Sequence, residues 1–264
     1  MSKKKDLLLL GLLILLLVVV NYSFIDFFLK SFFDIYEYGV VERVIDGDTV
    51  EINGTSVRLL GINTPERGEK YYEEAKEFLE NEVLNKNVRL EFGQEKYDWY
   101  GRELAYIFLG SKNINLEVVS SGWGNYYFPV GKQRYYLDFV SAWEECVDEN
   151  LVGTSCENSV DECVNCILLK KVDVKNQEVI LENVCNKDCD ISGWGVKDEG
   201  RKNYFFGGGS FIFAGDEIKL IVGEGEDSFG KYYWAGESYV WTSSGDTLFL
   251  RDSEGKLVLW EIVE

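Results

Sequence analysis

The chain of 264 residues contains no histidine. This absence excludes Ser–His and Cys–His nucleophile systems and every metal site that uses a histidine ligand. Any catalysis must use carboxylates, thiolates, amides or arginines, and a metal is best expected as a hard cation with oxygen ligands. Proline is also scarce, with two residues against 26 glycines. With many Val, Ile, Tyr, Phe and Trp, this composition favours β-structure with tight turns.

Positive charge is in short supply, because 27 Lys and Arg face 46 Asp and Glu, for a net charge of -19. A protein that holds nucleic acid by bulk electrostatics is basic instead. Nucleic acid could therefore be held here only locally, by a few arginines and a bound cation. The hydrophobic content of 46% is enough to bury one large core or two ordinary ones.

Long apolar runs are restricted to the N-terminal segment. Lys3 to Lys5 precede an apolar run from Leu7 to Val20, which continues to Phe28 with few polar interruptions. Residues 7–28 can span a bilayer, with the lysines on the cytoplasmic side. No small-x-small cleavage site follows, so we predict that residues 1–35 are a membrane-anchoring segment, spanning the bilayer as a helix through residues 7–28, with extracytoplasmic domains beyond it. A cleaved signal peptide, which would make the protein secreted, is the alternative.

All six cysteines lie in the second half of the chain, at Cys146, Cys156, Cys163, Cys166, Cys185 and Cys189. An even number of cysteines beyond a membrane anchor favours disulfides. Cys163-Val-Asn-Cys166 with the last two cysteines is loosely similar to a four-thiolate zinc knot, which is the less favoured alternative.

The first region, residues 38–150, alternates apolar and polar residues between turn signals, and Asn53-Gly54 is a strong hairpin signal. The predicted elements are strands at 38–45, 48–52, 56–62, 87–93 and 103–109, and helices at 69–85, 114–122 and 135–150. Five short strands with helices in this order indicate a mainly β fold, a closed barrel of the OB type.

The second region, residues 166–264, follows a cysteine-bearing linker at residues 151–165 and contains strand signals only. The predicted strands are 167–174, 178–184, 192–198, 203–207, 210–223, 238–243, 246–253 and 256–263. Strands at this spacing with glycine turns indicate a β-sandwich.

Polar residues of both signs punctuate the stretch DGDTVEINGTSVRLLGINTPE, residues 46–66, and the turn in DWYGRELAYI. The candidate site residues are Asp48, Arg58, Asn63, Thr64, Glu66, Tyr100 and Arg102. Taken singly, each has an ordinary explanation, such as an Asx turn for Asp48. Together, these residues of both charges are suited to bind one cation and one anion.

These motifs, in this order, resemble the staphylococcal nuclease (thermonuclease) family over residues 38–150. The resemblance implies an OB barrel with flanking helices and a calcium-dependent phosphodiesterase that cuts DNA and RNA. By motif, Asp48 and Asn63 fall on calcium-ligand aspartates, and Thr64 falls on a residue that lends its backbone carbonyl. Arg58, Glu66 and Arg102 fall on the catalytic arginine, the glutamate and the second arginine, and Tyr100 on a tyrosine that packs against the nucleotide.

The chemistry agrees with this resemblance, since a phosphodiester needs its charge neutralised and a water molecule aimed at phosphorus. Calcium accepts carboxylate, carbonyl and amide oxygens. Arginines donate in a fork to phosphate oxygens, and a glutamate can activate water. Asn63 departs from the family pattern and removes one negative charge, so calcium affinity should fall and another divalent cation could serve.

The stretches DISGWGVKDEGRKNYFF and YYWAGESYVWTSSGDTLFLRDSEGKLVLW resemble a lamin-tail domain, an immunoglobulin-like β-sandwich, over residues 166–264. Trp194, Trp234 and Trp241 are predicted to lie in its core. The resemblance implies binding or positioning, with a partner that the sequence does not specify. The chain as a whole is interpreted as a surface nuclease. The alternative is an OB-fold surface protein that binds nucleic acid or another ligand without cutting it, although such a binder would be free to lose Arg58, Glu66 and Arg102.

Overall fold

The computed structural model describes residue 11, residue 17 and residues 36–263. The chain divides into two compact units, residues 1–37 and residues 38–264. The predicted membrane anchor, residues 7–28, falls almost wholly outside the described residues. Within the part of the chain that is described, no helix is both long enough and apolar enough to cross a membrane.

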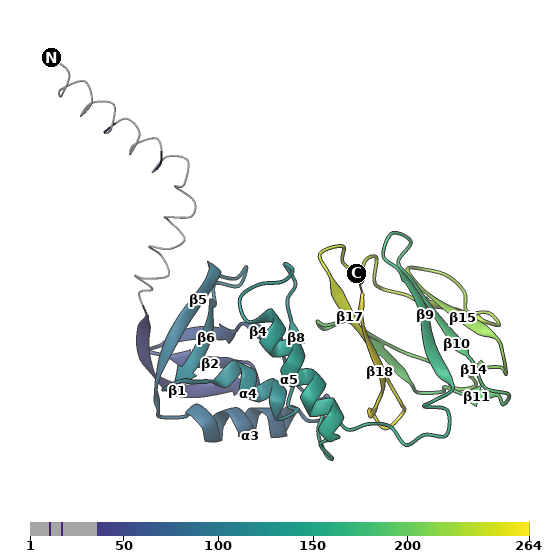
Figure 1. The fold of residues 1–264 in the computed structure, drawn as a ribbon, viewed down its shortest axis with the longest axis horizontal. Coiled ribbons are helices and arrows are strands. Elements are labelled where there is room, and N and C mark those ends of the chain that lie inside the picture. The colour runs from purple at the N-terminus through teal and green to yellow at the C-terminus, as the bar shows by residue number, and fades with distance from the viewer. Residues whose placement is uncertain (1–10, 12–16, 18–35, 264) are drawn as a thin grey trace. The chain divides into compact units, whose positions relative to one another are not determined.

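The first region contains a closed five-stranded barrel, in agreement with the predicted OB type (Figure 1). Its strands are β1 (Glu37–Asp46), β2 (Thr49–Ile52), β3 (Thr55–Leu59), β5 (Asn87–Tyr97) and β6 (Glu103–Leu109). They lie in the order β3-β2-β1-β5-β6, and a parallel pairing of β3 with β6 closes the barrel. The short strand β7 (Lys112–Asn113) pairs antiparallel with the end of β6. Asn53 and Gly54 both have positive φ, as the predicted hairpin turn requires.

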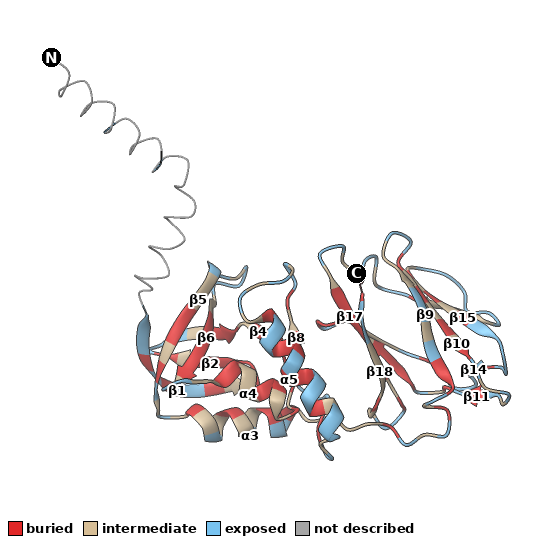
Figure 2. Ribbon diagram, viewed as in Figure 1, coloured by how far each residue is buried: buried red, intermediate tan, exposed pale blue. Residues whose placement is uncertain are grey.

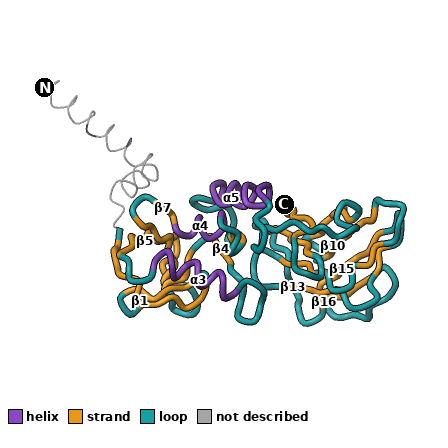
Figure 3. Tube along the Cα trace, turned by 90° about the horizontal axis from the view of Figure 1, so that it is seen from below, coloured by secondary structure: helices purple, strands orange, loops and turns teal. Residues whose placement is uncertain are grey.

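Three helices and a short strand pair complete this region, and strands and loops make up the rest of the described chain (Figure 3). The helices are α3 (Tyr72–Val83), α4 (Ile114–Ser120) and α5 (Tyr136–Glu149), and the pair is β4 (Gly61–Asn63) with β8 (Asn125–Tyr127). Each predicted helix is present with slightly shorter bounds. Buried and exposed positions alternate along α5, as expected for a helix with one face on a core (Figure 2).

The second region consists of strands, in agreement with the predicted immunoglobulin-like sandwich. One four-stranded sheet has the order β16-β15-β10-β9, another has the order β13-β12-β17-β18, and β11 pairs with β14. The bounds are β9 (Ile167–Asp173), β10 (Glu178–Asn183), β11 (Cys189–Asp190), β12 (Gly195–Lys197), β13 (Asn203–Phe205), β14 (Phe211–Ile212), β15 (Glu217–Val222), β16 (Lys231–Trp234), β17 (Asp246–Arg251) and β18 (Leu257–Val263).

Two predictions in this region were wrong. Residues 238–243 form no strand, because the backbone N–H groups of Val240 and Trp241 donate to the side-chain Oε1 of Gln177 instead of to a sheet. The edge strand there is β16, which pairs in parallel with β15 and was not predicted. Residues 210–223 form two strands rather than one, since Gly215 has a positive φ and turns the chain between them.

Two hydrophobic clusters hold the described chain together. The second cluster contains Trp194, Trp234 and Trp241, which confirms that these tryptophans are core residues. The first cluster fills the barrel and packs under the helices, and it also includes Phe249 and Leu257 from β17 and β18. The last strands of the second region therefore contribute to the core of the first.

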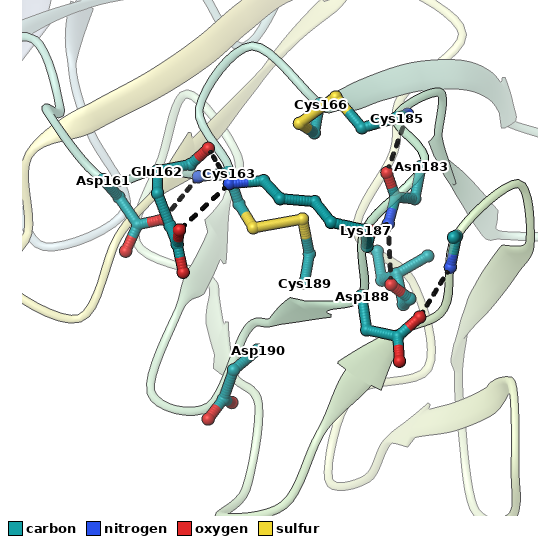
Figure 4. Close-up of a disulfide and its surroundings, with 12 residues drawn as sticks. Asp161, Glu162, Cys163, Cys166, Asn183, Cys185, Lys187, Asp188, Cys189 and Asp190 are labelled. Carbon is teal, nitrogen blue, oxygen red and sulfur yellow. Dashed lines mark hydrogen bonds and ion pairs between the residues drawn. A yellow bond between two sulfur atoms is a disulfide. The ribbon is translucent and has the colours of Figure 1, made fainter.

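All six cysteines form disulfides, which link Cys146 to Cys156, Cys163 to Cys189, and Cys166 to Cys185. The zinc-knot alternative does not apply, since the described chain has no free cysteine. The last two bridges lie close together at one end of the second region (Figure 4). Asn183 stiffens the same loop, because its Oδ1 accepts from the backbone of Cys185 at 3.0 Å and its Nδ2 donates to Lys187 O at 2.8 Å.

Candidate active site

The centre of the candidate site is the tight turn that joins β1 to β2. Asp48 N donates to Asp46 Oδ1 at 3.2 Å, which brings the two carboxyl groups to one side of the turn. Gly47 is required by space, since a Cβ there would lie 2.8 Å from Thr64 Oγ1. Burial, reinforced by the negative charge of Asp48, raises the pKa of Asp46 to about 6. The turn therefore gathers negative charge that a cation would stabilise.

A buried ion pair connects this turn to the barrel. Arg58 Nη1 lies 2.7 Å from Asp48 Oδ1, and both side chains are less than a tenth exposed. Arg58 also donates to the carbonyl oxygens of Asp48, Leu59 and Ile62 at 3.1–3.4 Å. In the register of β3 with β2, Arg58 lies opposite Thr49, which is also buried.

Thr64 joins the same cluster through the other oxygen of the carboxylate. Its backbone N–H and its hydroxyl donate to Asp48 Oδ2 at 3.2 and 3.1 Å. The cluster of Asp48, Arg58 and Thr64 is therefore held by direct contacts between three of the predicted residues.

Asn63 lies beside this cluster, at the end of β4 and opposite Asn125 in β8. Its side chain is buried, and its Nδ2 donates to the carbonyl oxygen of Gly200 at 2.8 Å. Its Oδ1 is buried without a hydrogen-bond partner among the described residues. Gly124 allows this arrangement, because a Cβ there would lie 2.7 Å from Asn63 O. An orphaned buried oxygen next to a carboxylate cluster suits a cation.

Glu66 is exposed at the rim of the site and contacts the second region. Arg201 Nε lies 2.7 Å from Glu66 Oε1, and the two side chains are 53% and 45% exposed. This pair was not predicted, because Glu66 lies between β4 and α3 whereas Arg201 lies between β12 and β13, far along the chain. Arg201 thus contacts a predicted site residue although it belongs to no recognised motif.

Tyr100 and Arg102 form a separate group near the start of β6. Arg102 Nε pairs with Asp98 Oδ2 at 2.7 Å, and its guanidinium lies 5.5 Å from the centre of the Tyr100 ring. Tyr100 is 84% exposed. The parallel register places Glu103 opposite Val57, so Arg102 lies across the barrel seam from the strand of Arg58. No hydrogen bond or ion pair within residues 36–263 joins this group to the Asp48 cluster.

The loop that carries Arg201 is fixed to the first region by buried hydrogen bonds. Asn125 Nδ2 donates to Glu199 O at 2.8 Å, and Phe128 N donates to Glu199 Oε2 at 3.0 Å. Burial is the main cause that raises the pKa of Glu199 to about 7 and that of Asp198 to about 6, and nearby Asp246 raises both further. The boundary between the regions therefore contains a buried cluster of carboxyl groups.

A cavity of about 540 Å³ is lined by residues of both regions. Asn63 and Pro65 of the first region and Lys197, Asn203 and Arg251 of the second are among them. Lys197 and Arg251 face it, and desolvation lowers their pKa values to about 8 and about 10. The carboxylates of Glu69, Asp252 and Glu254 line the same cavity, so the charge of its lining is mixed.

Comparison with known proteins places these features in two families. Residues 56–151 match the family described as Staphylococcal nuclease homologue, and residues 165–261 match the Lamin Tail Domain. The chain is 34% identical over 135 residues to the Thermonuclease of Staphylococcus intermedius, a match that covers 47% of this chain and 80% of that protein.

Two further relatives also match part of the chain. An uncharacterized protein of Methanocaldococcus jannaschii is 39% identical over 157 residues, covering 47% of this chain and 74% of the relative. An uncharacterized endonuclease of Haemophilus influenzae is 33% identical over 102 residues, covering 37% of this chain and 56% of the relative. This chain belongs to the staphylococcal nuclease family, and its nuclease domain is followed by a lamin-tail domain.

Proposed function

We propose that this protein is a metal-dependent nuclease that hydrolyses phosphodiester bonds of DNA or RNA. The observation that carries the proposal is the buried cluster of Asp48, Arg58 and Thr64 beside the orphaned Oδ1 of Asn63. It offers a cation site and an arginine within one small volume, the two features that phosphodiester hydrolysis requires. The nuclease names of several relatives support nucleic acid as the substrate class.

The residues present fit calcium as the metal. No group of three or more acidic or thiol side chains that could hold a metal occurs in residues 36–263. Calcium would be held by Asp48, by the Asn63 amide oxygen and by the Thr64 carbonyl, which are all hard oxygen donors. When bound, it would neutralise negative charge at the phosphate. Another divalent cation that accepts oxygen ligands would fit the same donors.

The protein side chains have distinct roles in the proposed reaction. Arg58 donates to phosphate oxygens and stabilises the charge that grows in the transition state. Glu66 is exposed enough to reach water, and it takes the proton of the attacking water molecule. Arg102 serves as the second phosphate-binding arginine once it leaves Asp98, and Tyr100 offers an exposed ring for stacking on a base.

The test is to incubate the full chain with single- and double-stranded DNA and RNA, with calcium or with excess EDTA. We expect cleavage with calcium and none with EDTA. Full activity in EDTA would remove the metal from the mechanism. Binding of nucleic acid without cleavage under all conditions would instead support the binding-protein alternative.

We also propose that the protein works outside the cytoplasm, anchored through residues 7–28 or secreted after cleavage. Three disulfides support an oxidising compartment, and the lysines before the apolar run support a cytoplasmic N-terminus. Mass spectrometry of the native protein distinguishes the two forms. A mature N-terminus after residue 20 would establish a cleaved signal peptide.

A further inference from the structure

The loop between β12 and β13, residues 198–202, is the part of the lamin-tail domain that contacts the nuclease site. Gly200 accepts a hydrogen bond from Asn63, Glu199 accepts one from Asn125, and Arg201 pairs with Glu66. The consecutive residues 199–201 thus contact Asn63 and Glu66, which have proposed roles, and Asn125 in the neighbouring strand β8. Because three such contacts hold this loop, we treat it as part of the site.

The guanidinium of Arg201 has hydrogen-bond donors that remain available to a ligand. Its Nε pairs with Glu66 Oε1, and no partner of its two terminal amines occurs among residues 36–263. The side chain is 53% exposed, so the open edge of the fork faces solvent. A free guanidinium edge matches the two oxygens of a phosphodiester.

Of the two nuclease-domain arginines with proposed roles, Arg58 is more fully engaged than Arg201. Arg58 is buried and donates to a carboxylate and three backbone carbonyls. Arg102 pairs with Asp98 through its Nε, as Arg201 does with Glu66, but it lies in the separate group near Tyr100. Arg201 is therefore the arginine at Glu66 that can meet a phosphate without first breaking a buried contact.

Tyr127 gives an independent sign that Arg58 and Arg201 approach one place. Burial and the charge of Asp198 raise the pKa of Tyr127, and the positive charges of Arg58 and Arg201 both oppose this rise. Arginines from two domains thus act on the same tyrosine, which lies in β8 next to the strand of Asn63.

We propose that Arg201 of the lamin-tail domain is a phosphate-binding residue of the nuclease site. This inference rests on the proposed function and assigns part of the substrate site to the second domain. Without substrate, Arg201 is paired with Glu66. A phosphodiester of the nucleic acid replaces Glu66 as the partner of the Arg201 guanidinium. The carboxylate of Glu66 is then free to accept the proton of water.

The experiment compares the full-chain variants Arg201→Ala and Arg201→Lys with the wild type, using a fluorescent single-stranded oligonucleotide. Binding is measured in EDTA as a function of salt, and cleavage is measured with calcium. We expect Arg201→Ala to lower kcat/KM by about a hundredfold and the slope of log affinity against log salt by about 0.7, as for one lost phosphate contact. Arg201→Lys should restore the slope but only part of kcat/KM, because lysine lacks the fork.

Arg43→Ala is the matched control. Arg43 Nη2 pairs with Glu51 Oε2 at 2.7 Å on the barrel surface, so this variant also breaks an exposed Arg–Glu pair of the same length. It should leave binding, salt slope and cleavage unchanged.

The Glu66→Gln background separates phosphate binding from support of Glu66. If Arg201 binds phosphate, adding Arg201→Ala to Glu66→Gln still weakens oligonucleotide binding and still lowers the salt slope. The proposal is overturned if Arg201→Ala has no effect on binding in the Glu66→Gln background, or if Arg201→Ala alone behaves like the wild type. It is also overturned if Arg201→Ala cleaves faster than the wild type, which would show that the Arg201–Glu66 pair blocks the site. A wild type that neither binds nor cuts the oligonucleotide would instead contradict the proposed function itself.

Discussion

The inner and outer parts of the site contain ion pairs of equal length in opposite surroundings. In the nuclease core, Arg58 and Asp48 lie 2.7 Å apart, and both side chains are less than a tenth exposed. At the domain boundary, Arg201 and Glu66 also lie 2.7 Å apart, but about half of each side chain is exposed. Distance alone therefore does not tell what either pair contributes.

The two ion pairs should differ in their contribution to stability because they differ in exposure to solvent. Removal of one partner of a buried pair leaves an uncompensated charge in a poorly solvated interior and costs about 3–5 kcal/mol. An exposed pair contributes about 0–1 kcal/mol, because water solvates either partner after the other is lost. The inner pair should therefore support both the fold and catalysis, whereas the outer pair should act on catalysis with little effect on stability.

The largest effect is expected from Arg58→Ala. It should lower the free energy of unfolding by about 3–5 kcal/mol, because Asp48 is left buried and unpaired, and it should lower turnover by about a hundredfold or more. Denaturant unfolding and cleavage assays measure the two effects.

A second variant keeps this prediction open to test if Arg58→Ala does not fold. Asp48→Asn with Arg58→Met removes both charges and should recover most of the stability while remaining inactive. A stable, active Arg58→Ala protein would show that the inner pair is not different from the outer one.

Glu66→Ala tests the outer pair. Turnover should fall by about a hundred- to a thousandfold, whereas the free energy of unfolding should change by less than about 1 kcal/mol. Steady-state kinetics and denaturant unfolding of the same preparation give both values. A destabilisation as large as that of Arg58→Ala would mean that the exposed pair holds the domains together.

The third prediction concerns Asn63, which touches both parts of the site. In Asn63→Asp, a carboxylate replaces the amide that donates to Gly200 O, so the variant should melt below the wild type without metal. Calcium should then raise its melting temperature more than that of the wild type, because calcium affinity follows ligand charge. Thermal melts in a calcium titration measure this without relying on activity.

Asn125→Asp is the control for the third prediction. Asn125 lies opposite Asn63 and donates to Glu199 O, so this variant also loses a donor at the boundary but adds no ligand to the proposed metal site. It should lower the melting temperature and leave the calcium shift unchanged. An equal calcium shift in all three proteins would show that Asn63 does not face the metal.

The smallest effect is a pH dependence at the domain boundary. The pKa of Glu199 is raised by burial from its usual 4.5 to about 7, so the folded state holds its proton more tightly than the unfolded state between these values. Stability contributed by this proton is present below about pH 4.5 and is lost as the pH rises towards 7. The melting temperature of the wild type, relative to Glu199→Gln, should therefore fall between about pH 4.5 and 7. Parallel pH curves for the two proteins would count against this assignment.

The inner part of the site could be predicted from the sequence because it is local. Asp48, Arg58 and Thr64 lie within one short run of strands, so their proximity could be predicted, whereas their chemical roles remain predictions. The buried contacts of Arg58 were not predicted, since alternation along a strand does not tell which face lies inside a small closed barrel. The metal assignment of Asn63 and the roles of Tyr100 and Arg102 remain predictions.

The outer part could not be predicted, because its two sides are joined only by tertiary structure. Asn63 and Gly200 are 137 positions apart, and the loop of Arg201 has no motif of its own. The failed strand at residues 238–243 has a similar cause, since the side chain of distant Gln177 takes the place of a partner strand. Local pattern identifies elements, but it does not identify partners brought together by folding.

The first hydrophobic cluster contains residues of both regions, so it can be completed only late in the synthesis of the chain. Phe249 and Leu257 belong to the core that fills the nuclease barrel, yet they are synthesised after the whole nuclease domain. A nascent chain that ends before them lacks part of that core. The enzyme would therefore mature only after its second domain has been synthesised and, if it is exported, has crossed the membrane, which would protect the nucleic acids of the cell that makes it.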